Sequence, residues 1–282
     1  MKIQKALSVV LTAIVLTGCT GGKLKIDASG NASPWTHLNL YNNPDNFHFA
    51  IVADRTGGHQ PGIFEDAVQK LNLLKPQFVL CVGDLVEGDA DDPNRAQQQW
   101  SEFDAIVDKL EMPFFYLPGN HDITNPLMAQ TWQQRLGKTY YHFVYRNCLF
   151  LFLNTEDPPP RSISPDQIEY FRKTLAADKS VRWTFVLMHE PLWKGKSARY
   201  WEEFETLLDD RPYTVFAGHD HNYNKSVING RSFYILGTTG GFLDESVPRR
   251  DHFVWVTMTE KGPVLANLLL DGIAGDQLPT RN

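Results

Sequence analysis

Two histidines, His219 and His221, stand one residue apart in the segment AGHDHN, directly after the apolar run Tyr213–Phe216. Side chains alternate in direction along a strand, so a strand that continued through both would point the two rings to opposite faces. If the strand ends at Gly218, the following loop can direct both rings to one place. Two imidazoles on one loop suggest a metal site. The question is which residues supply the other ligands.

Four further predicted strands are also followed by side chains that can bind a metal or transfer a proton. In open α/β sheets, functional groups collect just beyond the carboxyl ends of the strands. The strands and the polar segments after them are 48–53 with Asp54 in VADRTGG, 78–82 with GDLVEG, 114–117 with PGNHD, and 183–188 with HEP. Together with GHDH at 218–221, these segments give five polar clusters at predicted strand ends.

The order of the predicted elements indicates the fold that positions these clusters. Apolar strands alternate with amphipathic helices at 62–74, within 93–110, at 165–177 and at 200–208, and this alternation is typical of βαβ units with a mostly parallel sheet. Later strands are closely spaced, at 225–228, 232–236, 253–257 and 264–270, with an Asn229-Gly230 hairpin signal. A second antiparallel pair is predicted at 140–145 and 149–153. We therefore expect an α/β fold, a two-sheet β-sandwich flanked by helices.

In this order, the clusters resemble the calcineurin-like metallophosphoesterase superfamily, whose motifs run D-x-H, G-D-x-x, G-N-H-D/E, a single His and G-H-x-H. The resemblance covers nearly the whole region from Phe47 to Leu270. GNHD and GHDH in the right order, each at a predicted strand end, are specific signals together. The resemblance implies a four-layer αββα fold and hydrolysis of a phosphomonoester, phosphodiester or pyrophosphate by a metal-bridging hydroxide.

The resemblance also assigns the metal ligands. Phosphoester hydrolysis needs a nucleophile at neutral pH and relief of charge on the phosphoryl oxygens, and two metal ions supply both. By resemblance, Asp84 bridges the two metals, Asp54 and His221 bind one of them, and the other is bound by Asn120, His189 and His219. The two opening histidines then serve different ions of one cluster. A nitrogen and oxygen ligand set without thiolate fits manganese, iron or zinc better than calcium.

The same resemblance gives the catalytic proton donor. His121 protonates the leaving oxygen, and Asp122 orients its ring. A histidine held by a carboxylate is a plausible general acid near neutral pH.

One motif departs from the family pattern, because Thr56 stands where D-x-H has its histidine. Three outcomes are open: a water takes the position, His59 in GGHQPG replaces the missing ligand, or that site binds metal weakly. Arg55 beside the site could contact substrate phosphate through its fork of donors, or be an ordinary structural arginine. Because of Thr56, an alternative function also stays open: a non-catalytic, surface-tethered domain that binds a phosphorylated partner.

The N-terminus has the pattern of an export signal. Residues 1–5 carry Lys2 and Lys5, residues 6–16 are apolar, and LTGC at 16–19 resembles the bacterial lipoprotein lipobox. We expect a signal peptide at 1–18, lipidation at Cys19, and a Gly-, Ser- and Asn-rich tether over 19–46. The metallophosphoesterase domain is expected at 47–274 and a tail at 275–282. The lipid would hold the protein on a membrane of the bacterial cell envelope, facing the periplasm or the exterior.

Composition limits the partners. The formal net charge of −6 argues against broad binding of a nucleic-acid polymer. It permits a phosphorylated small molecule, or a lipid or nucleotide substrate, because a local metal charge outweighs the net balance. Cys81 and Cys148 lie in apolar runs and are expected to be buried thiols, although a disulfide is possible in an exported protein.

Overall fold

The computed structural model describes residue 36, residue 40 and residues 42–157, 160–208, 211–242 and 251–273. Contacts divide the chain into Met1–Pro44 and Asp45–Asn282, and the fold described below belongs to the second unit. The predicted signal peptide, Cys19 and the tail at 275–282 lie outside the described residues. Within the described part of the chain, no helix combines the length and the apolar character that crossing a membrane requires.

Among the described residues, eleven strands form two mixed sheets. The first sheet has the order β11 (Gly262–Leu269), β10 (His252–Thr259), β1 (Phe47–Val52), β2 (Val79–Cys81), β3 (Phe114–Phe115). The second has the order β4 (Tyr141–Tyr145), β5 (Cys148–Leu153), β6 (Trp183–Met188), β7 (Tyr213–Ala217), β9 (Arg231–Ile235), β8 (Asn224–Ile228). In the first sheet β1, β2 and β3 are parallel, and β10 and β11 add antiparallel pairs beside β1. In the second sheet β5, β6, β7 and β9 are parallel, and β4 and β8 pair antiparallel at the two edges. The mostly parallel sheet expected from the first half of the sequence is therefore two mixed sheets.

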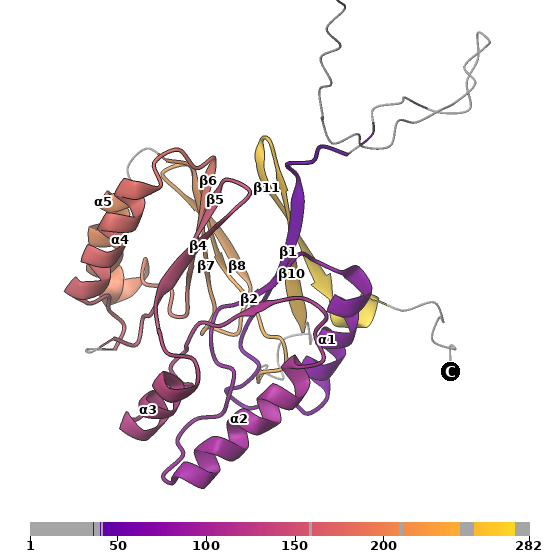
Figure 1. The fold of residues 1–282 in the computed structure, drawn as a ribbon, viewed down its shortest axis with the longest axis vertical. Helices are drawn as coiled ribbons and strands as arrows, with labels where there is room; N and C mark the ends of the chain where they lie inside the picture. Colours follow the sequence, from indigo (N-terminus) through magenta and orange to yellow (C-terminus); the bar gives the residue numbers. More distant parts are fainter. Residues whose placement is uncertain are drawn as a thin grey trace, which may run out of the picture. The chain divides into compact units, whose positions relative to one another are not determined.

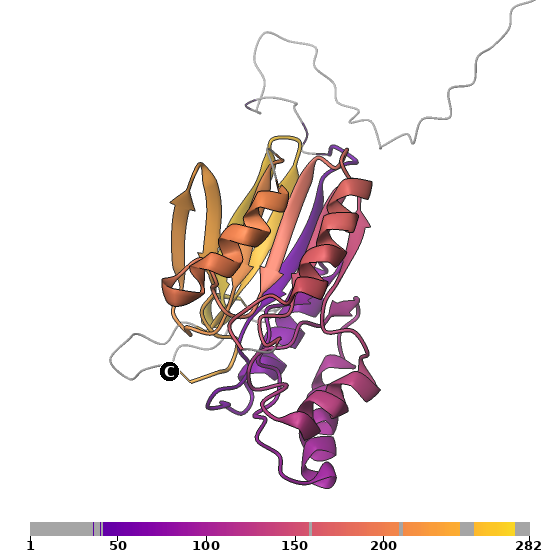
Figure 2. The same cartoon turned by 90° about the vertical axis from the view of Figure 1, so that its left-hand side faces the viewer.

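Helices cover the outer faces of both sheets. The helices of the described residues are α1 (Ile63–Leu74), α2 (Pro93–Val107), α3 (Pro126–Arg135), α4 (Pro165–Ala177) and α5 (Ala198–Leu208), with short 3-10 turns at Gly195–Ser197 and Leu270–Gly272; α2 and α3 lie beyond one end of the sheets (Figure 1). Figure 1 shows α4 and α5 outside the second sheet and α1 outside the first. Figure 2 shows α4 and α5 running along the strands of the sheet that they cover. The predicted two-sheet sandwich flanked by helices is confirmed.

Strand β5 shows how the sequence builds two apolar layers. Its six residues, CLFLFL, are all buried, and successive side chains point to opposite faces. Phe150 stacks on Phe185 of the same sheet at 5.0 Å between ring centroids and meets Phe49 of the first sheet edge-on at 5.3 Å. Leu149, Leu151 and Leu153 instead pack with the buried residues of α4 and α5. A continuous apolar strand of this kind fits burial on both faces.

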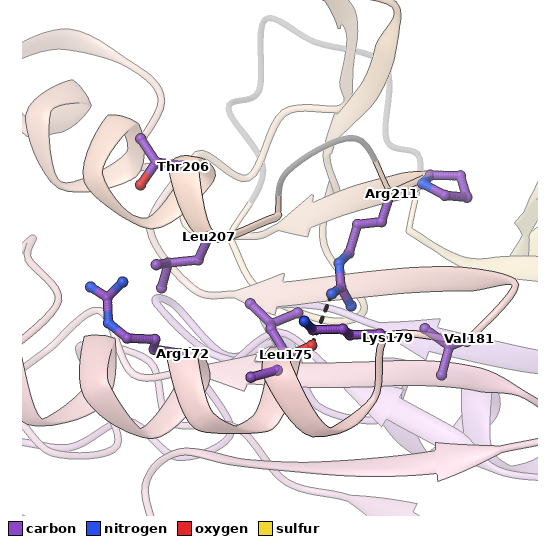
Figure 3. A pocket seen from close by; sticks show the side chains of 9 residues that line it. Arg172, Leu175, Lys179, Val181, Thr206, Leu207 and Arg211 are labelled. Carbon is purple, nitrogen blue, oxygen red and sulfur yellow. Dashed lines mark hydrogen bonds between the residues drawn. The ribbon is translucent and has the colours of Figure 1, made fainter.

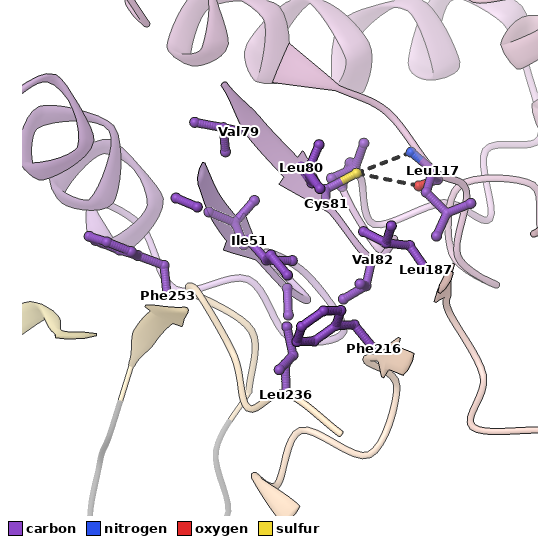
Figure 4. Close-up of a cluster of buried hydrophobic side chains, with 14 of the residues drawn as sticks. Ile51, Val79, Leu80, Cys81, Val82, Leu117, Leu187, Phe216, Leu236 and Phe253 are labelled. Atoms are coloured by element: carbon purple, nitrogen blue, oxygen red, sulfur yellow. Dashed lines mark hydrogen bonds between the residues drawn. The ribbon is translucent and has the colours of Figure 1, made fainter. Parts of the chain in front are cut away.

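The core between the sheets reaches the carboxyl ends of the strands. Figure 4 shows Cys81 in the same cluster as Ile51, Leu187 and Phe216, with its sulfur hydrogen-bonded to the backbone N–H and carbonyl oxygen of Leu117. Cys81 and Cys148 are both buried and free, so the expected buried thiols are confirmed. This rigid layer supports the loops that carry the polar clusters.

Local signals explain the connections. Asn229 and Gly230 have φ of 50° and 74°, the left-handed pair that a two-residue hairpin needs, and they join β8 to β9 as predicted. Helix α3 was not predicted, although its start has a clear signal. The Asn125 side chain accepts a hydrogen bond from the backbone N–H of Met128, and Pro126 occupies the first turn.

Candidate metal centre

The six candidate metal ligands lie together where the two sheets meet, beyond the carboxyl ends of β1, β2, β3, β6 and β7. Four of them have left-handed backbone conformations: Asp54 (φ 44°), Asp84 (φ 58°), His219 (φ 71°) and His221 (φ 52°). Non-glycine residues seldom adopt this region, and each instance costs on the order of 1–3 kcal/mol. Such strain is tolerated where the surrounding fold fixes the direction of a functional side chain.

One set of donor atoms, which we call the second donor group, comprises Asp84, Asn120, His189 and His219. His189 Nε2 lies 2.9 Å from Asn120 Oδ1 and 3.3 Å from Asp84 Oδ2. His219 Nδ1 lies 2.9 Å from the same Asn120 oxygen and 3.3 Å from His189 Nε2. Four atoms at this spacing match ligands that lie about 2.0–2.2 Å from one common ion.

The other set, the first donor group, comprises Asp54, Asp84 and His221, each of which offers one atom within 4.8 Å of the others. His221 Nε2 lies 3.5 Å from Asp54 Oδ1. Asp54 is fully buried, and its Oδ2 has no hydrogen-bond partner among the residues that the structure describes. A buried carboxylate oxygen without a partner is costly, and a cation at this position would satisfy it. Asp84 belongs to both groups, as a bridging ligand must.

Backbone carbonyls select the ring nitrogens that face these groups. His189 Nδ1 lies 2.8 Å from the carbonyl oxygen of Val82, and His221 Nδ1 lies 2.8 Å from that of Phe242. A carbonyl oxygen only accepts, so Nδ1 carries the proton in both rings and Nε2 keeps its lone pair for a metal. The spacing of the donor atoms therefore suits metal ions, and so do the tautomers of His189 and His221, which leave Nε2 free to bind.

The electrostatics also favour a cation. Burial raises the pKa of Asp54 well above its usual range. Burial and the charge of Asp84 raise the pKa of Asp122 to about 7. Burial opposes a charge on His189, but the neighbouring Asp84 carboxylate overcomes it and raises the pKa of this imidazole to about 10, so a positive charge is favoured at Nε2, where a metal ion would take the place of the proton. Buried carboxylates thus outnumber the positive charges beside them, and a bound metal ion would correct the balance.

His121 lies beside the first donor group with one ring nitrogen fixed. Its Nδ1 is 2.8 Å from the carbonyl oxygen of Glu87, and its backbone N–H donates to Asp84 Oδ1 at 3.0 Å. A methyl group placed on Gly57 would lie 3.1 Å from His221 Nε2 and 3.5 Å from His121 Nε2. Both Nε2 atoms therefore face the same small space, which a side chain at position 57 would fill.

The hydrogen bonds of Asp122 differ from those that its expected role requires. Its carboxylate accepts backbone N–H groups of Asp84, Leu85, Val86 and Gly119 at 2.8–3.0 Å. The group that holds the His121 ring is the Glu87 carbonyl. Asp122 fixes the loop that carries Asp84, and it acts on the centre through the backbone.

Arg55 is also placed differently from the expected phosphate contact. Its side chain donates to the carbonyl oxygen of Leu85 at 2.8 Å and lies over the Phe103 ring at 5.6 Å. Only 5% of the residue is exposed. These contacts are those of a structural arginine, the alternative that the sequence left open.

The position of the missing family histidine is filled by a buried residue. Thr56 is 0% exposed. The backbone N–H of His59 donates to Glu87 Oε1 at 2.7 Å, and among the described residues the first donor group contains Asp54, Asp84 and His221 without His59. The structure therefore gives no support to His59 as a replacement ligand.

Sequence reasoning missed Arg161. Its Nε pairs with Glu190 Oε2 at 2.8 Å, and its Nη2 lies 3.2 Å from His219 Nε2. Arg161 belongs to the loop at 156–164, whose sequence has no motif, and it is 58 residues from His219 along the chain. The sequence offered one signal for charged groups next to His219: Glu190 directly follows the candidate ligand His189.

Comparisons with known proteins identify the family. The sequence model of the calcineurin-like phosphoesterase family matches residues 14–223, more than half of the chain, and the chain belongs to this family. The predicted resemblance is confirmed.

Individual relatives agree with this assignment. The chain is 31% identical to the serine/threonine-protein phosphatase CPPED1 of Danio rerio over 199 residues, which are 62% of this chain and 64% of the relative. It therefore spans less than two thirds of that protein. It is 24% identical to the 3′,5′-cyclic adenosine monophosphate phosphodiesterase CpdA of Haemophilus influenzae, over 63% of this chain and 67% of the relative.

A solved structure shows the same fold. The crystal structure of a dimetal phosphatase from Danio rerio aligns with a TM-score of 0.59 at 16% identity, covering 79% of this chain and 96% of that one.

Proposed function

We propose that this chain is a metal-dependent phosphoesterase that hydrolyses a phosphomonoester, phosphodiester or pyrophosphate. One observation carries the proposal: His121 Nε2 faces the same space as His221 Nε2, beside two donor groups that share Asp84. A structural metal site does not require a free imidazole nitrogen directed at its edge, whereas a hydrolase requires a proton donor there.

Each residue has a defined task in this proposal. Asp54, Asp84 and His221 would hold one metal ion, and Asp84, Asn120, His189 and His219 would hold the other. The bound ions supply charge neutralisation and activation of water. The Glu87 carbonyl keeps a proton on Nδ1 of His121, so the second proton of the cationic ring sits on Nε2, where it can pass to the leaving oxygen. The ions would be manganese, iron or zinc, in line with the nitrogen and oxygen donors.

The test combines metal analysis with turnover. The chain from Thr20 onward should bind close to two transition-metal ions and hydrolyse p-nitrophenyl phosphate or its bis-ester. Asp84→Asn should lose metal and reduce hydrolysis by at least about a hundredfold, because both donor groups share this carboxylate. Asp89→Asn is a matched control: Asp89 lies on the same loop, also has positive φ (47°), and is exposed.

The rival function is a tethered domain that keeps the fold and binds a phosphorylated partner without turnover. Buried Thr56 supports it, because the first donor group lacks the imidazole that the family motif places there. One metal ion or fewer, even after refolding with manganese, iron or zinc, together with no hydrolysis, would favour this rival.

We also propose that Cys19 carries a lipid that holds the chain on a bacterial envelope membrane. The support is the sequence alone: Lys2 and Lys5, the apolar residues 6–16, and LTGC before the expected cleavage. Mass spectrometry of the N-terminal peptide would show acyl chains on Cys19, and an unmodified cysteine within an intact leader would contradict the anchor.

A further inference from the structure

A cavity of about 460 Å³ opens directly beside His219, between the segment that follows β6 and the loop that follows β7. We call it the basic cavity. Its charged and titratable lining residues are Arg161, Glu190, Lys194, Lys196, His219 and Asp220. The tasks proposed above for the metal centre use only His219 among these six.

His219 connects the basic cavity to the metal centre. Its Nδ1 belongs to the second donor group, and its Nε2 faces Arg161 Nη2 at 3.2 Å and Glu190 Oε2 at 3.8 Å. An imidazole that offers the lone pair of Nδ1 to a metal carries its proton on Nε2. Arg161 Nη2 is also a donor, so the two cannot bond to each other in that state. Glu190 Oε2 lies 3.8 Å from His219 Nε2, beyond hydrogen-bond distance, so its charge faces His219 without a hydrogen bond, and Arg161 Nη2 is left for another acceptor.

The cavity has an excess of positive charge. Lys194 Nζ pairs with Asp220 Oδ2 at 2.9 Å, and Arg161 Nε pairs with Glu190. Within the described part of the chain, no ion pair is recorded for Lys196, which is exposed. The side chains of Arg161 and Lys194 are 60% and 54% exposed, so an incoming ligand meets them without opening the core. Three cations and two carboxylates on a chain of net charge −6 make this a local site for an anion.

We propose that the basic cavity binds a second phosphate group of the substrate, so that the preferred substrates are organic bisphosphates. This inference rests on the proposed function, since it names the class of substrate for the same centre. One phosphoryl group meets the metal centre, and the other meets the guanidinium edge of Arg161 and the ammonium of Lys196. The planar fork of an arginine matches two phosphate oxygens, and a nearby lysine adds a point charge.

A second basic cavity, of about 540 Å³, provides the contrast. Figure 3 shows Arg172, Lys179 and Arg211 around it, with Arg211 bonded to the carbonyl oxygen of Leu175 at 3.0 Å. It adjoins Val181 and Pro212, which precede β6 and β7, so it lies at the opposite ends of these strands from the metal centre. Its arginines serve as a matched control for charge alone.

The experiment measures binding separately from turnover. Isothermal titration calorimetry of the manganese-loaded chain would compare ethane-, propane- and butane-bisphosphonates with the monophosphonates of the same chain lengths. The readout is the affinity ratio within each pair. We expect at least one ratio of about tenfold or more. Arg161→Gln and Lys196→Ala should each reduce that ratio by about threefold to tenfold, while Arg172→Gln leaves it unchanged.

A ratio near one at every spacer length, or an absence of binding, would overturn the inference. A ratio that survives both Arg161→Gln and Lys196→Ala would also overturn it, because the second phosphonate would then bind elsewhere. Failure of the proposed function looks different: the bisphosphonate preference would persist in a chain that hydrolyses no ester. Hydrolysis of simple esters without any preference would leave the function standing and remove the basic cavity from it.

Discussion

Hydrogen bonds from ring nitrogens to backbone carbonyls determine what each histidine of the centre can do. His121, His189 and His221 all have Nδ1 2.8 Å from a carbonyl oxygen, so all three present Nε2 to the site. The difference lies in what meets Nε2. Those of His189 and His221 lie beside carboxylate oxygens at 3.3 and 3.5 Å, whereas that of His121 lies 3.5 Å from the position of a Cβ on Gly57, in the small space that it shares with His221. The first two suit ligands, and the third suits a proton donor.

His121→Ala tests this division at the residue scale. A general acid matters most when the leaving oxygen is a poor leaving group, so alkyl phosphates should slow by about a hundredfold to ten-thousandfold. p-Nitrophenyl phosphate, whose leaving group needs little protonation, should slow far less. The measurement is kcat/KM over a series of leaving groups. His48→Ala is the control, since His48 stacks on Trp255 at the far end of β1. Equal losses on both substrate types would contradict the acid role.

Single residues also show where sequence reasoning stops. The candidate ligands could be placed because each follows a strand end, and parallel strands bring their carboxyl ends together. For Asp122, its position directly after His121 in the sequence suggested a contact with the His121 ring. Its carboxylate instead accepts hydrogen bonds from four backbone N–H groups. Arg161 could not be found, because its contact with His219 joins two loops across 58 residues. No local pattern encodes such a contact.

At the scale of elements, the loops that follow the strands can bring their ligands together because glycines let the loops approach one another closely. A Cβ on Gly119 would overlap Asp84 Oδ1 and lie 2.8 Å from His189 Nδ1. The loop after β3 can therefore reach the loop after β2 only without a side chain at this position. Sequence periodicity predicted the strands to within two residues at each end, but it could not show that two sheets contribute loops to one centre. That arrangement depends on how the sheets pack.

Gly119→Ala tests the close approach. The added methyl group has to displace the shared carboxylate of Asp84, so we expect loss of bound metal and a decrease in the free energy of unfolding of about 1–3 kcal/mol. Metal analysis and urea unfolding measure the two effects. Gly272→Ala is the matched control, because no atom of the described residues lies within 4 Å of the added methyl group there. Full metal content in Gly119→Ala would show that the loops can separate without cost to the centre.

At the scale of the whole molecule, the metal centre joins the two sheets at one end. Asp54 and Asp84 follow strands of the first sheet, and His189, His219 and His221 follow strands of the second. Packing holds the sheets together elsewhere, through aromatic contacts such as Phe49 on Phe150 and on Phe185. A bound ion that contacts both sheets stabilises the folded chain over the unfolded one, by about 2.7 kcal/mol at a free concentration of a hundred times Kd.

The two buried thiols report this coupling, because Cys81 is in β2 of the first sheet and Cys148 is in β5 of the second. Burial raises the pKa of Cys81 to about 12 and also raises that of Cys148, so neither reacts as a thiolate while the chain is folded. We expect a chelator to accelerate labelling of both thiols by up to about a hundredfold at pH 8, as the stabilisation by metal is lost. Mass spectrometry resolves the two sites.

Asp84→Asn supplies the control, since its labelling should be equally fast with and without chelator. If removal of metal accelerates Cys81 and Cys148 to the same extent, the centre stabilises the whole sandwich. If it accelerates neither, the two sheets are held by packing alone and the ions contribute only to chemistry. Acceleration of Cys81 alone would place the effect in the first sheet, whose loop carries the carboxylate that both donor groups share.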